Sequence, residues 1–154
     1  MSAESQALTG ASAVAIGGRA LMIEGPPGSG KSSLALALID RGAMLIGDDG
    51  VTLTHTGERV MVSPPPNIAG LIEIRGVGLA ELPLAAPTPL AMILTLGNAG
   101  ERLPAAVPTR DILGHAIPCL AFEPGSIAPA LRGEWALAMH GLEFASLRAA
   151  NPRK

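Results

Sequence analysis

The sequence predicts an α/β fold, with a mixed central sheet flanked by helices, from three local observations. Residues 25–32, GPPGSGKS, fill every fixed position of the phosphate-loop pattern G-x-x-x-x-G-K-[ST]. A short apolar run over residues 20–24 precedes this loop and predicts a buried strand. An apolar-rich run over residues 32–41 follows it and predicts a helix that ends at Gly42. Strand, glycine-rich loop and helix is the order of a P-loop domain, so we expect this chain to bind a nucleoside triphosphate.

The residue types of the loop suit a phosphate chain. Glycines let backbone N–H groups converge on phosphate oxygens, Lys31 is expected to reach the β and γ oxygens, and the Ser32 hydroxyl is expected to ligate Mg²⁺. Only Lys31 and Lys154 are lysines, so a general abundance of lysine does not explain Lys31. The expected nucleotide-binding residues are Gly25, Pro26, Pro27, Gly28, Ser29, Gly30, Lys31, Ser32 and Ser33.

Shorter patterns predict the other strands. Residues 11–16 predict a strand that turns at Gly17 and Gly18 and pairs antiparallel with the strand before the phosphate loop. Further strands are expected over residues 43–47, 51–55, 59–62, 71–75, 90–96 and 116–122. The second and third of these flank a glycine-containing turn and predict a hairpin.

The C-terminal region predicts a helix. Ser126 is expected to cap it, and the helical region is expected to run to about Ala150. A length of 154 residues fits one domain, residues 1–154, with about residues 1–10 and 151–154 flexible at its ends.

Composition excludes several classes of protein. With 48% hydrophobic and 16% charged residues the chain is expected to fold rather than stay disordered. Few aromatic residues and a net charge of −2 argue against a nucleic-acid partner. The longest apolar region, residues 79–96, contains Glu81 and three prolines, so no membrane helix is expected, and the N-terminus lacks the basic start of a signal peptide. These features predict a cytoplasmic protein.

Two adjacent carboxylates follow the strand expected over residues 43–47. Ligands gather at the carboxyl ends of strands in open α/β sheets, so Asp48 and Asp49 are expected to lie beside the phosphate loop. Charged groups there need a partner, which Mg²⁺ with bound ATP supplies. The alternative interpretation is a solvated turn, because Asp-Asp-Gly is a favourable turn sequence.

Three motifs lie within residues 11–122. In the first, residues 38–42, LIDRG, end the expected helix, and Asp48-Asp49 follow Lys31 at a short interval. The other two are residues 71–78, LIEIRGVG, and residues 101–103, ERL. Together they resemble a known family, the HPr kinase/phosphorylases, which has the same short interval, an E-[IV]-R-G-x-G motif and an acidic-Arg-Leu motif. The resemblance is to the C-terminal kinase domain, of the short proteobacterial type that lacks an N-terminal domain.

The resemblance implies an ATP- and Mg²⁺-dependent serine kinase. Its acceptor would be the phosphocarrier HPr of the sugar phosphotransferase system, in a role that regulates carbon metabolism. Asp49 matches the general base, which takes the proton of the serine hydroxyl. By the same matching, the expected catalytic residues are Asp48, Asp49, Lys31 and Arg102, and the expected Mg²⁺ ligands are Ser32 and Glu73. The family usually assembles as hexamers, which implies a homo-oligomer here.

The chain departs from the family pattern at two motifs. Gly10 stands where the family commonly has a histidine, and Pro124-Gly125-Ser126 lacks the arginine of a P-G-R-N-type segment associated with dephosphorylation. The reverse phosphorylase reaction is therefore left open. Two other interpretations stay open too: a P-loop module that binds nucleotide and regulates without transfer, and a kinase of a different acceptor.

Overall fold

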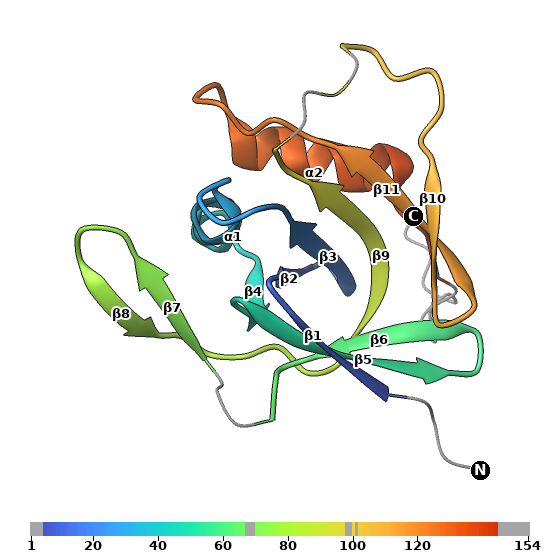
Figure 1. Ribbon diagram of the computed structural model, residues 1–154, viewed down its shortest axis with the longest axis horizontal. Coiled ribbons are helices and arrows are strands. Elements are labelled where there is room, and N and C mark those ends of the chain that lie inside the picture. The colour runs from blue at the N-terminus through green and yellow to red at the C-terminus, as the bar shows by residue number, and fades with distance from the viewer. Residues whose placement is uncertain (1–4, 67–69, 98–99, 101, 145–154) are drawn as a thin grey trace, which may run out of the picture.

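The computed structural model of the chain describes residues 5–66, 70–97, 100 and 102–144. Over these residues it shows an α/β fold in which a curled sheet packs against helices (Figure 1). The strands are β1 (Ser5–Thr9), β2 (Ser12–Ile16), β3 (Arg19–Glu24), β4 (Met44–Gly47), β5 (Gly50–Thr56), β6 (Arg59–Ser63), β7 (Leu71–Ile74), β8 (Gly78–Glu81), β9 (Thr88–Thr95), β10 (Thr109–Ile112) and β11 (His115–Ala121). The helices are α1 (Lys31–Asp40) and α2 (Pro129–His140).

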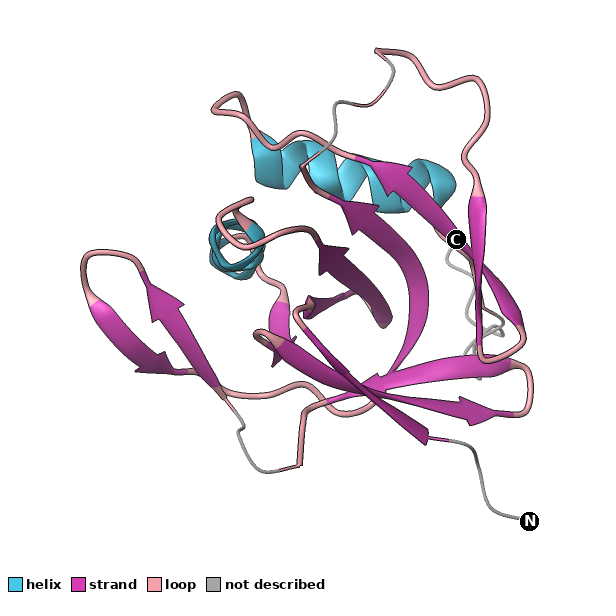
Figure 2. Cartoon of the chain, viewed as in Figure 1, coloured by secondary structure: helices cyan, strands magenta, loops and turns pink. Residues whose placement is uncertain are grey.

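The main sheet is mixed, as expected. Its strand order is β1-β5-β6-β9-β3-β2-β4, and β11 also pairs with β9. The strand β9 runs parallel to β3 and β11, whereas the β2–β3 and β5–β6 hairpins pair antiparallel as the sequence predicts. The start of β9 pairs with β6 and its end pairs with β11, so the sheet curls around this long strand (Figure 2).

Two hydrophobic clusters lie on opposite faces of the sheet. Along β3, Leu21 and Ile23 belong to the cluster that contains residues of both helices, whereas Ala20 and Met22 belong to the cluster that contains residues of β5 and β6. Successive side chains of a strand point to opposite faces, so the helices cover one face and the curled sheet encloses the other. The central strand is thus buried on both sides, and these four side chains are 0% exposed.

The elements around the phosphate loop confirm the predicted order of strand, loop and helix. The strand β3 leads into the loop, and α1 begins at Lys31 with three buried side chains on its inner face. After α1, the strand β4 ends at Gly47, immediately before Asp48. Because β2 pairs antiparallel with β4, the start of β2 at Ser12 lies at the end of β4. One edge of the fold therefore gathers the phosphate loop, Asp48 and Ser12.

The strand expected over residues 71–75 lies outside the main sheet. It is β7, which pairs with β8 in a separate two-stranded hairpin that projects from the body of the fold (Figure 1). Ile72 on β7 is 0% exposed and belongs to the helix-side cluster, so the hairpin is anchored against α1. Residues 73 and 75 therefore lie beside the start of that helix.

Residues 5–9, which lie in the segment expected to be flexible, form the strand β1. This strand pairs antiparallel with β5 along its whole length, from Ser5 opposite Thr54 to Thr9 opposite Gly50. Most of its side chains are exposed, so the strand is held by backbone hydrogen bonds and carries no apolar pattern that sequence analysis detects.

The C-terminal helix also differs from the prediction. Ser126 does not cap it, because α2 begins at Pro129 with Ala128 in the N-cap position and no side-chain cap. Proline suits the first helical position, where its fixed φ matches the helix and its missing N–H costs no bond. The helix ends at His140, and residues 145–154 lie outside the described part of the chain. Neither described helix has the length and hydropathy that crossing a membrane requires.

Candidate functional site: a phosphate-loop cavity

The phosphate loop folds around the ammonium group of its own lysine. Lys31 Nζ donates hydrogen bonds to the carbonyl oxygens of Gly25 at 2.7 Å and of Pro26 at 3.2 Å. Gly28 and Gly30 have φ values of 83° and 101°, in the left-handed region that glycine adopts without strain. The loop thus brings a positive charge to the N-terminus of α1, where helix N–H groups also favour anions.

Gly25 has no room for a side chain. A Cβ atom there lies 2.5 Å from Ser29 Oγ and 3.0 Å from both Leu96 Cβ and the Leu96 carbonyl oxygen. Ser29 Oγ is itself buried and has no hydrogen-bond partner among the described residues. A side chain at Gly25 therefore does not fit unless the start of the loop shifts.

We expect Gly25→Ala to cost about 1–3 kcal/mol of the free energy of unfolding, as overpacking commonly does, and to weaken nucleotide binding because the loop must shift. Denaturant unfolding and calorimetric titration with ATP measure the two effects. Gly133→Ala is the control, since a Cβ there meets Leu38 and Leu94 only at 3.8 Å, an ordinary van der Waals distance, and Gly133 lies on α2 outside the loop. Equal nucleotide affinity in both variants would contradict the packing argument.

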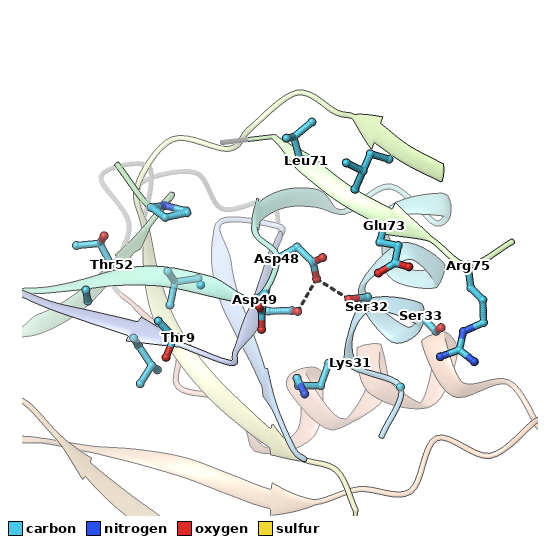
Figure 3. A pocket seen from close by; sticks show the side chains of 18 of the residues that line it. Thr9, Lys31, Ser32, Ser33, Asp48, Asp49, Thr52, Leu71, Glu73 and Arg75 are labelled. Atoms are coloured by element: carbon cyan, nitrogen blue, oxygen red, sulfur yellow. Dashed lines mark hydrogen bonds between the residues drawn. The ribbon is translucent and has the colours of Figure 1, made fainter. Parts of the chain in front are cut away.

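Two serine hydroxyls, one on α1 and one on β2, donate hydrogen bonds to Asp48. Ser32 Oγ donates to Asp48 Oδ1 at 2.7 Å, and Ser12 Oγ donates to the same oxygen at 2.8 Å (Figure 3). Ser32 belongs to α1 and Ser12 to β2, so the carboxylate joins two elements that are distant in sequence. The expectation that the acidic pair lies beside the phosphate loop is confirmed.

Asp49 differs from Asp48 in both backbone and side chain. Its φ is 64°, in the left-handed region, and its carbonyl oxygen accepts a hydrogen bond from the Gly10 N–H at 3.1 Å. The residue is exposed, and its carboxylate has no hydrogen-bond or ion-pair partner among the described residues. One carboxylate of the pair is thus held by hydrogen bonds, and the other is exposed at the cavity.

A cavity of about 680 Å³ collects these residues. Its lining comes from the phosphate loop, β1, β5, the Pro65-Pro66 segment and the β7–β8 hairpin, and Glu73 and Arg75 of that hairpin lie beside the start of α1 (Figure 3). The residues that line it are Ala7, Leu8, Thr9, Ser12, Gly28, Gly30, Lys31, Ser32, Ser33, Asp48, Asp49, Gly50, Val51, Thr52, Pro65, Pro66, Leu71, Glu73, Arg75 and Leu79. Lys31 and Arg75 are the cations of this lining.

Arg102 does not line this cavity. It lies at a second cavity of about 560 Å³, between α2 and the end of β11, together with Trp135 and Arg132. Glu101 of the same motif lies outside the described residues. The structure therefore brings together the expected residues of the loop, the acidic pair and Glu73, and it leaves Arg102 apart from them.

Sequence analysis missed two contacts at the loop. Ser12 carries no motif, and its link to Asp48 exists only because β2 and β4 pair antiparallel. Arg110, which belongs to no motif described above, forms a two-pronged ion pair with Glu24, the last residue before the loop, at 2.8 and 3.0 Å. Hydrogen bonding to Glu24 raises the pKa of Arg110 above its ordinary value, so the guanidinium stays charged.

Comparison with known proteins decides the family. Residues 2–84, more than half of the chain, match the family model described as HPr Serine kinase C-terminal domain. The chain belongs to this family. The match includes the phosphate loop, the acidic pair and the β7–β8 hairpin, so every residue that lines the cavity described above lies within it.

Individual relatives agree with this assignment. An HPr kinase/phosphorylase of Bordetella pertussis is 37% identical over 113 residues, which is 65% of this chain and 37% of the relative. One from an Exiguobacterium species is 43% identical over 70 residues, which is 45% of this chain and 22% of the relative. The chain thus spans well under half the length of these curated relatives.

A solved structure extends the likeness over most of the fold. The HPr(Ser) kinase/phosphatase of Coxiella burnetii superposes with a TM-score of 0.72 at 26% sequence identity. The superposition covers 86% of this chain and 89% of that one. It supports the HPr kinase type of P-loop fold that the sequence predicts.

Proposed function

We propose that this chain is an ATP- and Mg²⁺-dependent kinase that phosphorylates a serine of an HPr-type phosphocarrier. The observation that carries the proposal is that the two adjacent carboxylates differ in their hydrogen bonding. Asp48 is tied to the loop serine at 2.7 Å, whereas Asp49 faces the same cavity without a partner among the described residues. In this arrangement the Asp49 carboxylate can accept the substrate proton beside the phosphate loop.

In the proposed reaction the seryl oxygen of the acceptor attacks the γ-phosphorus of ATP. The bond between that phosphorus and the β,γ-bridging oxygen breaks, and ADP leaves with the bonding electron pair. Asp49 takes the hydroxyl proton, and Lys31 balances the negative charge on the phosphates. Asp48 keeps the Ser32 hydroxyl oriented at the start of α1.

The oxygen donors at the loop fit Mg²⁺, which prefers carboxylate, hydroxyl, water and phosphate oxygens. The described residues contain no group of three or more His, Cys, Asp or Glu side chains that could hold a metal by themselves. We propose that Ser32 and Glu73 hold Mg²⁺ together with the nucleotide phosphates, as P-loop proteins do. When bound, Mg²⁺ neutralises charge on the β and γ oxygens.

Glu73→Gln is expected to raise the Mg²⁺ concentration at half-maximal transfer by about tenfold, since a charge-assisted contact contributes about 1.5–3 kcal/mol. A Mg²⁺ titration of the transfer rate at fixed ATP measures it. Glu81→Gln is a matched control, because Glu81 is an exposed carboxylate on the same hairpin outside the cavity lining. An unchanged titration in Glu73→Gln would remove Glu73 from the metal site.

A nucleotide-binding regulator without transfer activity is the second candidate. The placement of Arg102 at the other cavity favours it, because one of the two expected catalytic cations is then absent from the phosphate-loop cavity. A kinase of a different acceptor shares all the chemistry above and differs only in its partner.

Transfer of labelled γ-phosphate from ATP to an HPr-type carrier tests the proposal. We expect label on a serine of the carrier, with none when Mg²⁺ is chelated. Nucleotide binding without transfer would favour the regulator, and transfer to another protein in place of the carrier would identify a different acceptor. The labelled carrier, incubated with phosphate and the enzyme, also tests the reverse phosphorylase reaction.

A further inference from the structure

Ser12 is a buried polar residue that the proposed mechanism does not use. It is 1% exposed and stands at the start of β2, opposite Ile23 of β3. The hydrogen bond that its hydroxyl donates goes to the carboxylate of Asp48 at 2.8 Å, not to the main chain. A serine that served only the packing of two strands would not need a charged acceptor in the nucleotide cavity.

The carboxylate of Asp48 receives two donors on one oxygen. Ser32 Oγ and Ser12 Oγ lie 2.7 and 2.8 Å from the same Oδ1 atom. Each hydroxyl has a single proton to donate and two lone pairs to offer. In this structure both hydroxyl protons are donated to Asp48.

The two serines differ in what else they must do. Under the proposed function, on which this inference rests, Ser32 would offer a lone pair to Mg²⁺ while its proton stays on Asp48, so the position of that carboxylate sets the direction of the lone pairs. Ser12 is given no metal to hold, and the strand that carries it is paired on both sides, with β3 and β4. Its bond to Asp48 is available in both the empty and the loaded site.

We infer that Ser12 is a positioning residue, which holds the Asp48 carboxylate where it directs the Ser32 hydroxyl toward Mg²⁺. Without Ser12, the only donor left to Asp48 Oδ1 among the described residues is Ser32. With one donor in place of two, the carboxylate can turn, and the Ser32 lone pairs that it directs turn with it. Ser12 therefore determines how much affinity Mg²⁺ adds to nucleotide binding, and it does so through Asp48 rather than as a metal ligand.

Two readouts on the full chain test this role. The first is calorimetric titration with a non-hydrolysable ATP analogue, with Mg²⁺ and with a chelator. In Ser12→Ala we expect the affinity gained from Mg²⁺ to fall about tenfold, the scale of one charge-assisted hydrogen bond. The second is steady-state transfer to the carrier, where we expect kcat to fall about tenfold and the KM for the carrier to stay within about twofold.

Two variants control for the hydroxyl and for the loss of a serine. Ser12→Thr keeps the donor and is expected to restore both readouts to near the wild-type values. Ser5→Ala removes an exposed hydroxyl contact, to Thr54 at 3.2 Å, and is expected to leave both unchanged. Ser12→Cys keeps a similar volume with a weak donor, so it replaces Ser12→Ala if that variant does not fold, with nearly the same losses expected.

Wild-type values in Ser12→Ala for the Mg²⁺-dependent affinity gain would overturn the inference. So would a Ser12→Thr variant as impaired as Ser12→Ala, since the hydroxyl would then not be the cause. The proposed function fails separately: if wild type binds the analogue with Mg²⁺ but transfers nothing to the carrier, the acceptor is wrong, and the titration still decides the role of Ser12.

Discussion

Lys31→Ala is expected to bind ATP about 100-fold more weakly than wild type, a loss of about 2.7 kcal/mol. The ammonium group lies within hydrogen-bond distance of two loop carbonyls, at 2.7 and 3.2 Å, so it sits at the centre of the loop rather than beside it. Its removal takes away the only positive side chain of the phosphate loop and leaves the nucleotide phosphates in a cavity lined by three carboxylates, Asp48, Asp49 and Glu73. Calorimetric titration with Mg²⁺ and ATP measures the change.

Arg41→Gln is the matched control for Lys31→Ala. Arg41 caps the far end of α1 and pairs with Glu134 on the surface, so its loss removes one positive charge without reaching the cavity. We expect ATP affinity to stay within about twofold of wild type, because an exposed charge outside a Debye length is screened. A Lys31→Ala variant that binds as tightly as Arg41→Gln would show that the loop backbone alone holds the phosphates.

The phosphate-loop region was predictable because its signals are local. A strand buried on both faces needs a continuous apolar run, the loop needs glycines at fixed positions, and the helix ends near a glycine. Residues 20–42 satisfy all three within one stretch of chain. The strand–loop–helix order and the antiparallel hairpin before it followed from neighbouring residues alone, and the structure has both.

The elements that sequence analysis missed depend on distant partners. The strand β1 exists because β5 offers it a backbone edge, and its exposed side chains leave no alternating pattern. The start of α2 is set by Pro129 rather than by a capping side chain. The first strand of the β7–β8 hairpin was predicted from its apolar residues. Nothing in the sequence indicates that this hairpin lies outside the main sheet.

The candidate site shows the same division between local and distant signals. Asp48 and Asp49 were predicted beside the loop because both follow a buried strand in the order that α/β folds use. Ser12 was missed because a lone serine in an apolar strand points to no chemistry until the strand pairing is known. Arg102 was placed at the site by family resemblance alone, and the fold puts it at another cavity.

Asp49→Asn is expected to slow transfer by about 10²–10⁴-fold, the usual contribution of general base catalysis, while ATP affinity stays within about threefold of wild type. The substitution is well matched to its position. Asp49 has a φ of 64°, and asparagine tolerates the left-handed region, so the backbone and the Gly10 contact to its carbonyl are kept. The variant therefore removes a proton acceptor and a charge without straining the loop. Single-turnover transfer and calorimetric binding, measured side by side, separate the two effects.

Asp48→Asn and Asp111→Asn complete the comparison. Asp48 holds Ser32, so its replacement is expected to weaken Mg²⁺-dependent binding as well as transfer, whereas Asp111 is an exposed carboxylate on β10 whose replacement is expected to change neither. If Asp49→Asn transfers at the wild-type rate and Asp48→Asn binds normally but does not transfer, the proton goes to the hydrogen-bonded carboxylate instead. The two serine hydroxyls would then donate hydrogen bonds to the general base itself, and the carboxylate of Asp49 would contribute to binding the acceptor.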